Sequence, residues 1–415
     1  MSEPQLPKAV LWESTACPLC GDARSRPIFV SGDLLYGCPG EFTLARCDGC
    51  GHVFLNPRPT RACIGQFYPS DYGPFRGGDD ALATHETSQL PLSHSGGESG
   101  GEGASSIDGE AVGPLSLALS PDAGARGPDR REPDRRGRCL TWRCLRRLVL
   151  WWIESRAAPI PKLEISNLKS QISKRALELG CAHGAFLDQL RQRGWECVGV
   201  DPAGDVAGRA RAKGLDVRVG SLEEVVTADQ ATFASASFDA VFAWMVIEHL
   251  HDPVATLRLA RKLLKPGGWL LFSVPNFGCW ERRVFGRFWY ALQLPTHLQQ
   301  FAPATVRRLL ESSGYELVEL IHQRNVNNLV GSAGLWLRAK FPRCSLGERL
   351  IRWTDNPSAL GLCCLAPLAM SLAAIRQCGR LTVVARRSVI GEPAASVPEG
   401  TESWNESGAD GLRSP

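Results

Sequence analysis

The stretch Ala176-Leu-Glu-Leu-Gly180-Cys-Ala-His-Gly184-Ala-Phe-Leu decides the fold of this chain. Its first part predicts a short apolar strand over 175–179, and its last part begins a helix predicted over 184–193. Gly180 lets the end of the strand approach a ligand closely, and the start of the helix favours an anionic group. A strand, a glycine turn and a helix in this order are typical of the ligand-binding edge of an open α/β sheet.

Downstream of this turn, short apolar strands alternate with helical segments. We expect strands over 196–200, 215–219, 238–244, 269–274, 315–321 and 381–385, and helices over 205–213, 253–264 and 303–313. Such alternation predicts a parallel sheet with helices on both faces. The predicted fold class is therefore α/β, with a seven-stranded and mostly parallel sheet.

An acid follows at the end of the second predicted strand, in Val198-Gly-Val-Asp201. It stands about 20 residues after Gly180, and a carboxylate at that spacing accepts the hydroxyls of a ribose. The glycine turn together with Asp201 fits either a nicotinamide dinucleotide or S-adenosylmethionine. These residues alone leave the two cofactors open.

Two C-x-x-C-G knuckles lie near the N-terminus, Cys17-Pro-Leu-Cys20-Gly and Cys47-Asp-Gly-Cys50-Gly. Structural zinc takes four thiolates in a tetrahedron, and each knuckle presents two of them from one tight turn. A redox dithiol would need only one knuckle. The pattern therefore predicts a structural zinc without a catalytic role, in a small module over 10–76.

Further motifs favour S-adenosylmethionine over a nicotinamide dinucleotide. They are Phe238-Asp-Ala-Val, Glu248-His249-Leu-x-Asp-Pro, Leu-Lys265-Pro-Gly-Gly, Leu294-Pro-x-His297-Leu-x-x-Phe and Leu310-x-x-x-Gly-Tyr. With the glycine turn and Asp201, they resemble the class I S-adenosylmethionine-dependent methyltransferases, which have a Rossmann-like fold. The resemblance includes bacterial enzymes that join a four-cysteine zinc ribbon to this domain. It spans residues 17–76 and about 139–387.

The resemblance implies that eight residues line the cofactor site: Glu178, Gly180, Gly184, Asp201, Ser221, Leu222, Trp244 and Met245. Glu178, Gly180 and Gly184 would line the methionine end of the cofactor, and Asp201 would hold the ribose. Ser221 and Leu222, after the third strand, would flank the adenine. Trp244 and Met245, at the end of the fourth strand, would lie near the sulfonium.

Two positions depart from the usual pattern of this family. Ala182 stands where a middle glycine is usual, and its methyl group narrows the space for the cofactor. Ser221 stands where an acid is frequent, which removes one hydrogen bond to the adenine. One added methyl group predicts weakened cofactor binding rather than none.

Two histidines are the candidates for acting on the methyl acceptor. An oxygen acceptor must lose its proton, and a nearby base helps this step. His249 follows the fourth predicted strand, and His297 lies in a loop that we expect to fold over the same cleft. Each is a candidate base or acceptor-orienting group. The alternative for each is a structural histidine satisfied by hydrogen bonds.

The amino-acid composition of the remaining segments predicts a linker, a tail and one further helix. Residues 77–137 contain no Phe, Trp or Tyr and are rich in Gly, Ser, Asp, Pro and Ala, which predicts a disordered linker. Residues 388–415 predict a disordered tail, and the methyltransferase-like domain is expected over 138–387. Residues 139–156 combine helical apolar spacing with an arginine face. They predict either a helix packed on the main domain or an interfacial membrane helix.

A long insertion over 325–378 separates the last two predicted strands, and it contains the apolar stretch 359–375. This stretch approaches the length of a membrane span, but the flanking strands are expected to be neighbours in one sheet, which argues against a crossing. The alternatives are a buried or lid helix, or a shallow membrane hairpin broken at Pro367. Such additions generally carry acceptor specificity on a fixed scaffold.

The predicted function is an S-adenosylmethionine-dependent methyltransferase acting on a small-molecule, glycan or lipid-linked acceptor, by O- or C-methylation. The alternatives are an RNA or protein methyltransferase that docks through its zinc ribbon, and a non-catalytic S-adenosylmethionine-binding protein. A net charge of +4 and the lack of a clustered basic face predict no nucleic-acid partner. We find no secretory signal in residues 1–25 and therefore expect a cytoplasmic protein, with peripheral contact at the inner face of the membrane as an option.

Overall fold

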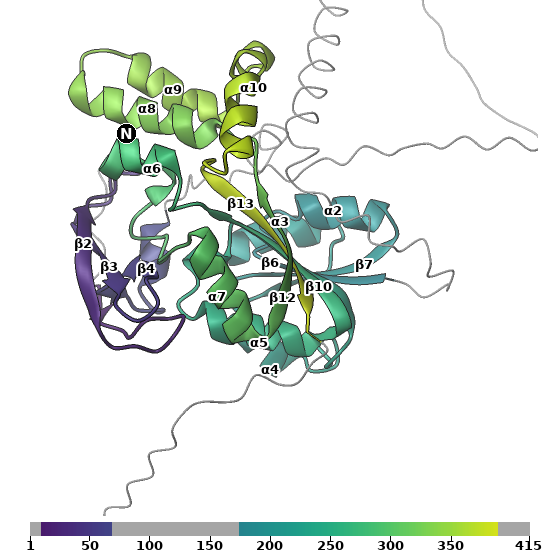
Figure 1. Ribbon diagram of the computed structural model, residues 1–415. Helices are drawn as coiled ribbons and strands as arrows, with labels where there is room; N and C mark the ends of the chain where they lie inside the picture. The colour runs from purple at the N-terminus through teal and green to yellow at the C-terminus, as the bar shows by residue number, and fades with distance from the viewer. Residues whose placement is uncertain (1–9, 69–173, 389–415) are drawn as a thin grey trace, which may run out of the picture.

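The computed structural model describes residues 10–68 and 174–388 (Figure 1). The predicted linker over 77–137, the predicted helix at 139–156 and the predicted tail beyond 388 lie outside the described residues. The two described parts of the chain contact each other extensively.

A seven-stranded sheet with the order β12-β13-β10-β9-β6-β7-β8 forms the centre of the molecule. Its strands are β6 (Lys174–Leu179), β7 (Trp195–Asp201), β8 (Val217–Val219), β9 (Phe238–Trp244), β10 (Leu264–Pro275), β12 (Tyr315–His322) and β13 (Arg380–Arg387). Only β13 runs against the others in this sheet, because it pairs antiparallel with both β10 and β12. The predicted seven-stranded, mostly parallel α/β fold is confirmed.

Helices cover both faces of this sheet (Figure 1). They are α2 (Ala185–Gln192) and α3 (Gly204–Ala212) on one face, and α4 (Leu222–Ala228), α5 (Pro253–Leu263) and α7 (Pro303–Ser313) on the other. Successive side chains along each strand point to opposite faces of the sheet. Leu177 of β6 therefore packs in the core shared with α5 and α7, whereas its neighbour Ala176 packs with Phe186 of α2.

Local signals fix the ends of these helices. The Asp252 carboxylate caps α5 by accepting the backbone N–H of Ala255 at 2.8 Å, and Pro253 occupies the first turn. Gly314 ends α7 with φ at 77°, a backbone conformation that glycine adopts without steric cost. These signals explain why the predicted bounds of α5 and α7 lie close to the observed ones.

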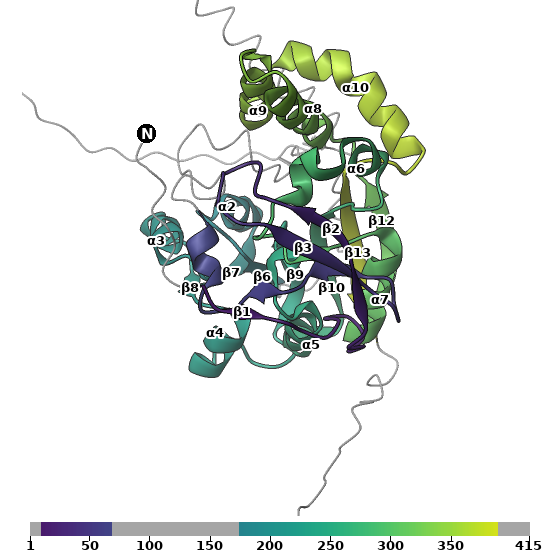
Figure 2. The ribbon, with the colours of Figure 1, turned by 90° about the vertical axis from the view of Figure 1, so that its left-hand side faces the viewer.

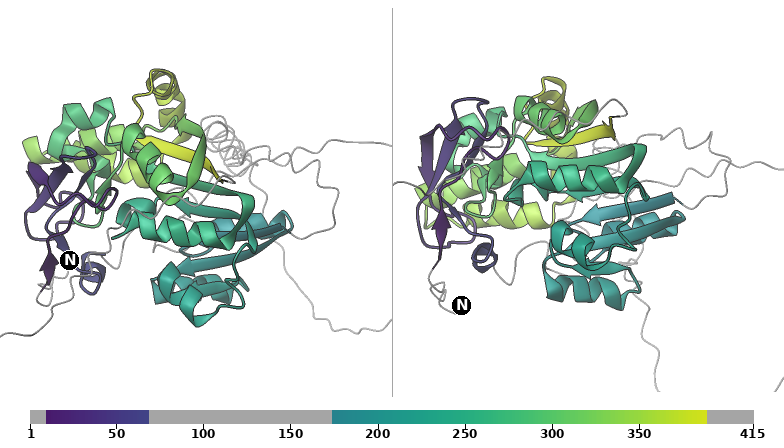
Figure 3. Two further views of the ribbon diagram at one scale, coloured as in Figure 1. Left: turned by 60° about the horizontal axis from the view of Figure 1, so that its bottom comes forward. Right: turned by 90° about the horizontal axis from the view of Figure 1, so that it is seen from below.

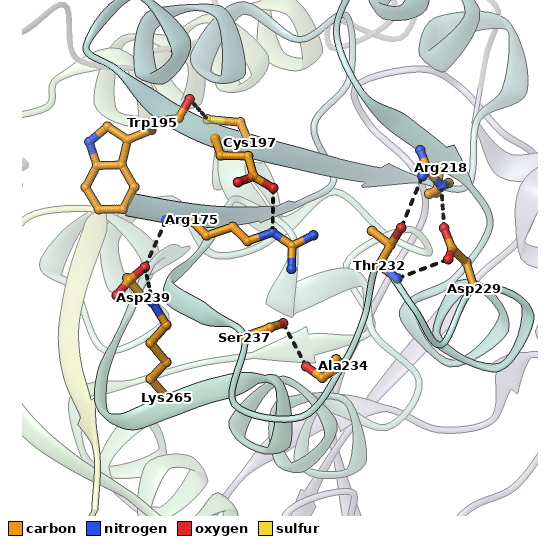
Figure 4. A network of polar contacts seen from close by, with 11 residues as sticks. Arg175, Trp195, Cys197, Arg218, Asp229, Thr232, Ala234, Ser237, Asp239 and Lys265 are labelled. Atoms are coloured by element: carbon orange, nitrogen blue, oxygen red, sulfur yellow. Dashed lines mark hydrogen bonds and ion pairs between the residues drawn. The ribbon is translucent and has the colours of Figure 1, made fainter. Parts of the chain in front are cut away.

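Charged side chains brace the edge of the sheet where the parallel strands begin (Figure 4). The Asp239 carboxylate accepts the backbone N–H of Arg175 at 2.9 Å and the ammonium of Lys265 at 2.8 Å. The Arg175 guanidinium pairs with Glu196 at 2.8 Å. These groups are partly exposed, so each pair adds at most about 1 kcal/mol. They lie at the edge opposite to the carboxyl ends of the strands.

The N-terminal module, residues 10–68, is built around a second sheet with the order β11-β4-β3-β2. The elements of this region are β1 (Trp12–Glu13), β2 (Ser25–Ser31), β3 (Phe42–Cys47), β4 (Val53–Leu55), β5 (Arg58–Pro59), η1 (Ile64–Phe67) and β11 (Gln299–Gln300). Strand β11 comes from the far end of the chain and pairs antiparallel with β4. Figure 2 shows the module from its outer side, with β2 and β3 toward the viewer.

The N-terminal module shares its core with the segment that follows β10. Phe42 and Leu55 are buried against Trp289, Leu292 and Leu298. In both views of Figure 3 the purple N-terminal strands accordingly lie beside green segments from the middle of the chain. The segment includes α6 (Trp280–Phe285), η6 (Gly286–Phe288) and η7 (Tyr290–Leu292).

Three helices stand between β12 and β13: α8 (Asn327–Lys340), α9 (Leu346–Asp355) and α10 (Ala359–Ala374). Helix α10 runs through Pro367 without interruption, so the hairpin broken at this proline, one of the two predicted alternatives, is not the structure that forms. Within the described ranges, no single helix is long and apolar enough to cross a bilayer. Helix α9 and residues 360–374 of α10 reach that level only as a pair bent by 84°.

Candidate active site

The carboxyl ends of β6, β7 and β9 bring most of the predicted cofactor residues to one edge of the sheet. Glu178 near the end of β6 pairs with Gly199 of β7 on one side and Phe242 of β9 on the other. Gly180 and Gly184, with φ at 64° and 78°, bound the turn into α2. A Cβ atom at these two glycines would overlap the side chains of Val246 and Leu215, so neither position accepts another residue without a shift.

Asp201 at the end of β7 holds this turn in place. Its two carboxylate oxygens accept the backbone N–H groups of Ala182 and Ala203, both at 2.8 Å. Each oxygen keeps a further lone pair for another donor. Asp201 is 6% exposed. Its contact with the ribose stays a prediction.

Ala182 lies in the middle of the turn with φ at 46°, in the left-handed region. An alanine there costs roughly 1–2 kcal/mol relative to glycine, because its Cβ approaches the following carbonyl oxygen. Alanine at position 182 therefore strains the backbone and also narrows the space expected for the cofactor.

Replacing this residue by glycine, Ala182→Gly, is expected to tighten binding of S-adenosylmethionine about three- to tenfold. The variant removes both the steric strain and the methyl group from the turn. Isothermal titration calorimetry of both proteins measures the change, with Ala228→Gly at the end of α4 as a control that leaves the turn intact. Equal or weaker binding by Ala182→Gly would show that the methyl group does not face the cofactor.

Two carboxyl groups, those of Glu178 and Asp201, lie beside the turn. Glu178 is 3% exposed, and its Oε2 makes no hydrogen bond within the described part of the chain. Burial, and then the charge of Asp201, hold the pKa of Glu178 well above its ordinary value; burial also raises the pKa of Asp201. A cationic ligand would favour the ionised form of both groups. S-adenosylmethionine, which carries an ammonium and a sulfonium, fits this pair of carboxylates.

Trp244 and Met245 end β9 beside this turn. The Trp244 ring packs edge-on against Phe186 of α2, with ring centroids 5.4 Å apart. Its indole Nε1 is buried and makes no hydrogen bond to any described residue. Met245 has φ at 54°, and its backbone N–H donates to the carbonyl of Ser273 at 3.1 Å. The contact of this pair with the sulfonium stays a prediction.

Ser221 is engaged in a helix cap. Its Oγ accepts the backbone N–H of Glu224 at 3.3 Å, and the Glu224 carboxylate accepts the N–H of Ser221 at 2.7 Å. This capping box and the helix α4 that it begins were not predicted, although Ser-Leu-Glu-Glu carries the signal. Leu222 is buried at the start of α4. The adenine contacts of Ser221 and Leu222 stay predictions.

The structure brings His249 and His297 together. Their rings lie edge to face with centroids 4.7 Å apart, His249 in η5 (Ile247–His249) after β9 and His297 in the loop before β11. His249 Nδ1 lies 3.0 Å from the carbonyl of Thr296, and His297 Nδ1 lies 2.9 Å from that of Ala291. Burial lowers the pKa of His249 to about 4 and that of His297 well below its ordinary value, so both rings are neutral near pH 7.

A tyrosine from the N-terminal module reaches this pair. The Tyr68 hydroxyl lies 2.9 Å from His249 Nδ1. Burial raises the pKa of Tyr68, and the charges of Glu248 and Asp201 raise it further. Tyr68 and the fully buried Glu248 were not predicted as site residues. No sequence motif links Tyr68 to a histidine 181 positions away.

The N-terminal module also anchors both histidine segments. Next to His297, the carbonyl of Leu298 accepts the N–H of Leu55 at 2.9 Å. Two residues after His249, the His251 ring bonds the carbonyl of Pro59 at 2.9 Å, and the carbonyl of His251 accepts from Arg58 at 2.6 Å. The positions of the two histidines therefore depend on the module.

The four cysteines of the two knuckles converge. Cys17 Sγ lies 3.5 Å from Cys50 Sγ, and Cys20 Sγ lies 3.5 Å from Cys47 Sγ. All four sulfurs lie within 4.8 Å of one another. Four thiolates at the usual Zn–S distance of about 2.3 Å are about 3.8 Å apart in a tetrahedron. The donor set fits a closed four-thiolate metal site.

A family model described as a methyltransferase domain matches residues 153–320. The chain contains a methyltransferase domain. Its mostly parallel sheet with flanking helices is that of an S-adenosylmethionine-dependent methyltransferase. The matched range runs from before β6 into β12 and includes the turn, Asp201 and both histidines.

Curated relatives of this domain carry one recurring name. A ubiquinone biosynthesis O-methyltransferase from Hydrogenovibrio crunogenus is 27% identical over 196 residues, which cover 45% of this chain and 76% of that protein. A protein of the same name from Xanthomonas axonopodis pv. citri is 32% identical over 158 residues, covering 35% and 64%. In a further one, from Paracidovorax citrulli, the match spans 57% of the relative.

Solved methyltransferase structures are more distant. A methyltransferase from Archaeoglobus fulgidus is 20% identical with a TM-score of 0.32, covering 60% of this chain and 94% of that one. A geranyl diphosphate C-methyltransferase from Streptomyces coelicolor is 14% identical with a TM-score of 0.35, covering 52% and 72%. At these scores the likeness carries no argument about the acceptor of the methyltransferase domain.

Proposed function

We propose that this methyltransferase domain transfers a methyl group to a hydroxyl oxygen of a small, partly apolar acceptor. The observation that carries the proposal is the pair of neutral rings, His249 and His297, packed together at the carboxyl end of β9. The relatives named as O-methyltransferases support oxygen as the accepting atom. A glycan or lipid-linked hydroxyl has the same reacting group.

S-adenosylmethionine supplies a methyl group already activated by its sulfonium, so the protein mainly contributes proximity and orientation. Asp201 and Glu178 would hold the ribose and the cationic end. The two histidines would position the acceptor hydroxyl, and Nε2 of either ring is able to accept its proton because Nδ1 bonds a carbonyl. Tyr68 would hold His249 in its orientation.

We also infer that Cys17, Cys20, Cys47 and Cys50 hold a zinc ion with a structural role. Four thiolates leave no open coordination position for a substrate. The ion would stabilise the N-terminal module, and through β11 the loop that carries His297.

The histidine pair is tested by substitution. In His249→Ala and His297→Ala we expect methyl transfer to fall by about 10²- to 10⁴-fold, because the acceptor hydroxyl loses its positioning group or base. Transfer of a radioactive methyl group to acceptors in a cell extract measures the effect. His322→Ala, at the end of β12, is the matched control. If both variants keep full turnover while the purified chain is active, neither histidine serves the acceptor.

The exposed face of α10 supports a lipid-linked acceptor and peripheral membrane contact. Its exposed positions recur at helical spacing and carry almost only apolar side chains: Leu360, Cys363, Cys364, Pro367, Leu368, Ser371, Ala374 and Ile375. We call this surface the α10 stripe. Residues 338–380, the stretch of chain that includes α10, contain seven Lys and Arg against two Asp and Glu. An apolar face on a basic segment of chain suits an anionic lipid surface.

Charged substitutions in the α10 stripe test this contact. The double variant Leu360→Glu and Leu368→Glu is expected to abolish co-sedimentation with vesicles of phosphatidylglycerol and phosphatidylethanolamine, because it places two carboxylates in the docking face. Val318→Glu, at an exposed site on β12, should leave binding unchanged. Failure of the unaltered chain to sediment with these vesicles would end the membrane proposal.

A further inference from the structure

The arginines described in the N-terminal module are paired with acids, with one exception. Four of these five arginines make an ion pair: Arg24 with Asp22, Arg26 with Asp48, Arg58 with Glu13 and Arg61 with Glu223. The fifth is Arg46, an exposed residue of β3. Its side chain makes no hydrogen bond or ion pair with any residue that the structure describes.

Arg46 lies among other cations. Its partner directly across the sheet, in β2, is Arg26, and like charges at opposite positions destabilise a sheet. On the other side, α6 contributes Arg282 and Arg283. Burial, and then the neighbouring charges of Arg46 and Arg283, lower the pKa of Arg282. We call Arg46, Arg282 and Arg283 the arginine cluster.

Two aromatic rings fix the position of Arg282. Its guanidinium carbon lies 4.1 Å from the ring centroid of Phe277, which follows β10, and 6.0 Å from that of Phe29 in β2. Helix α6 therefore lies against the N-terminal module at this point (Figure 1). Stacking on an aromatic face orients the plane of a guanidinium and leaves its N–H donors at the edge. These donors make no hydrogen bond to a described residue.

A half-buried guanidinium without an acid favours an anionic ligand, because it stays charged at any physiological pH. Phosphate oxygens match the paired N–H groups of an arginine, which donate two parallel hydrogen bonds. Three adjacent guanidiniums suit a group with more than one negative charge. A phosphate or diphosphate carries such a charge, whereas a single carboxylate does not.

We propose that the arginine cluster binds the phosphate or diphosphate group of a ligand at the junction between the two described parts of the chain. The bound group would bridge β3 of the N-terminal module and α6 of the methyltransferase domain, and it would relieve the repulsion between their arginines. This site goes beyond the proposed methyl transfer and does not depend on it.

Calorimetric titration of the full-length, zinc-loaded chain with inorganic pyrophosphate tests the site. We expect one site per chain, with binding at least about tenfold weaker in Arg46→Gln and in Arg282→Gln, because each loses a charged donor to the ligand. Arg46 is exposed, so its variant keeps the test valid if Arg282→Gln does not fold. The zinc content after the titration shows that pyrophosphate has not removed the structural metal.

Arg308→Gln is the matched control. Arg308 is an exposed arginine of α7, and it makes no ion pair within the described ranges. The control removes the same charge away from the arginine cluster, so pyrophosphate binding should stay within about twofold of that of the unaltered chain. The proposal is refuted if the unaltered chain shows no saturable binding of pyrophosphate, or if Arg46→Gln binds it as tightly as Arg308→Gln.

Vesicles of phosphatidylglycerol distinguish the two sources of the phosphate. If the source is a lipid headgroup, Arg46→Gln will co-sediment with these vesicles less than Arg308→Gln does, although its α10 stripe is intact. If both variants co-sediment equally while Arg46→Gln has lost pyrophosphate binding, the site takes a soluble phosphate ester. Either result supports the arginine cluster as a phosphate site.

Discussion

Replacing the acid at the end of β7, Asp201→Ala, is expected to weaken S-adenosylmethionine binding by at least about 100-fold. The carboxylate makes two 2.8 Å hydrogen bonds that hold the glycine turn, and its remaining lone pairs are available for the predicted ribose contact. Hydrogen bonds to a charged group contribute about 1.5–3 kcal/mol each, and about 1.4 kcal/mol corresponds to tenfold in affinity. Calorimetric titration with S-adenosylmethionine measures the loss.

Asp239→Ala is the control for this prediction. Asp239 also accepts a backbone N–H, that of Arg175, but it lies where the strands begin, away from the turn (Figure 4). Its variant should bind the cofactor within about threefold of the unaltered chain. A folded Asp201→Ala protein with unchanged affinity would remove Asp201 from the cofactor site.

Disrupting the four-cysteine site, with Cys47→Ser, is expected to lower methyl transfer by at least about 100-fold while S-adenosylmethionine binding persists. The module supplies Tyr68, pairs with β11 next to His297 and bonds the segment after His249. A displacement of about 1 Å in a positioning group is enough for such a loss. The cofactor turn, in contrast, is formed by β6, β7 and α2.

Turnover, S-adenosylmethionine binding and zinc content are measured on one preparation of Cys47→Ser. Together they distinguish a loss of acceptor positioning from a loss of cofactor binding. Cys344→Ser, at an exposed cysteine, should retain one structural zinc and full activity. If Cys47→Ser loses its zinc and keeps normal turnover, the module does not position the acceptor site. If the variant also loses cofactor binding, the module supports the whole domain rather than the acceptor side.

Much of the central sheet was predictable because its signals are local. The apolar run at Phe238–Trp244 and the helix Pro303–Ser313 have the bounds expected from the sequence, since proline and Gly314 mark the helix ends. Helix α4, which spans only Leu222–Ala228, was not predicted, although the sequence contains its capping box.

The acceptor side of the site was predictable only in part, because its contacts are not local. That His249 and His297 lie close together was expected from the sequence, and their ring centroids are 4.7 Å apart. The pairing of β11 with β4 was not expected, nor was the contact between His52 and Gln299, which are 247 positions apart. A two-residue strand such as Gln299–Gln300 carries no periodicity to detect.

Direct titration of the purified, zinc-loaded chain with S-adenosylmethionine and with its demethylated product tests the cofactor site most directly. The turn from Gly180 to Gly184 and the carboxylates of Glu178 and Asp201 predict one saturable site per chain, with a dissociation constant between about 1 µM and 1 mM. No saturable binding of either compound by the folded protein would contradict the assignment of this edge of the sheet as the methyl-donor site.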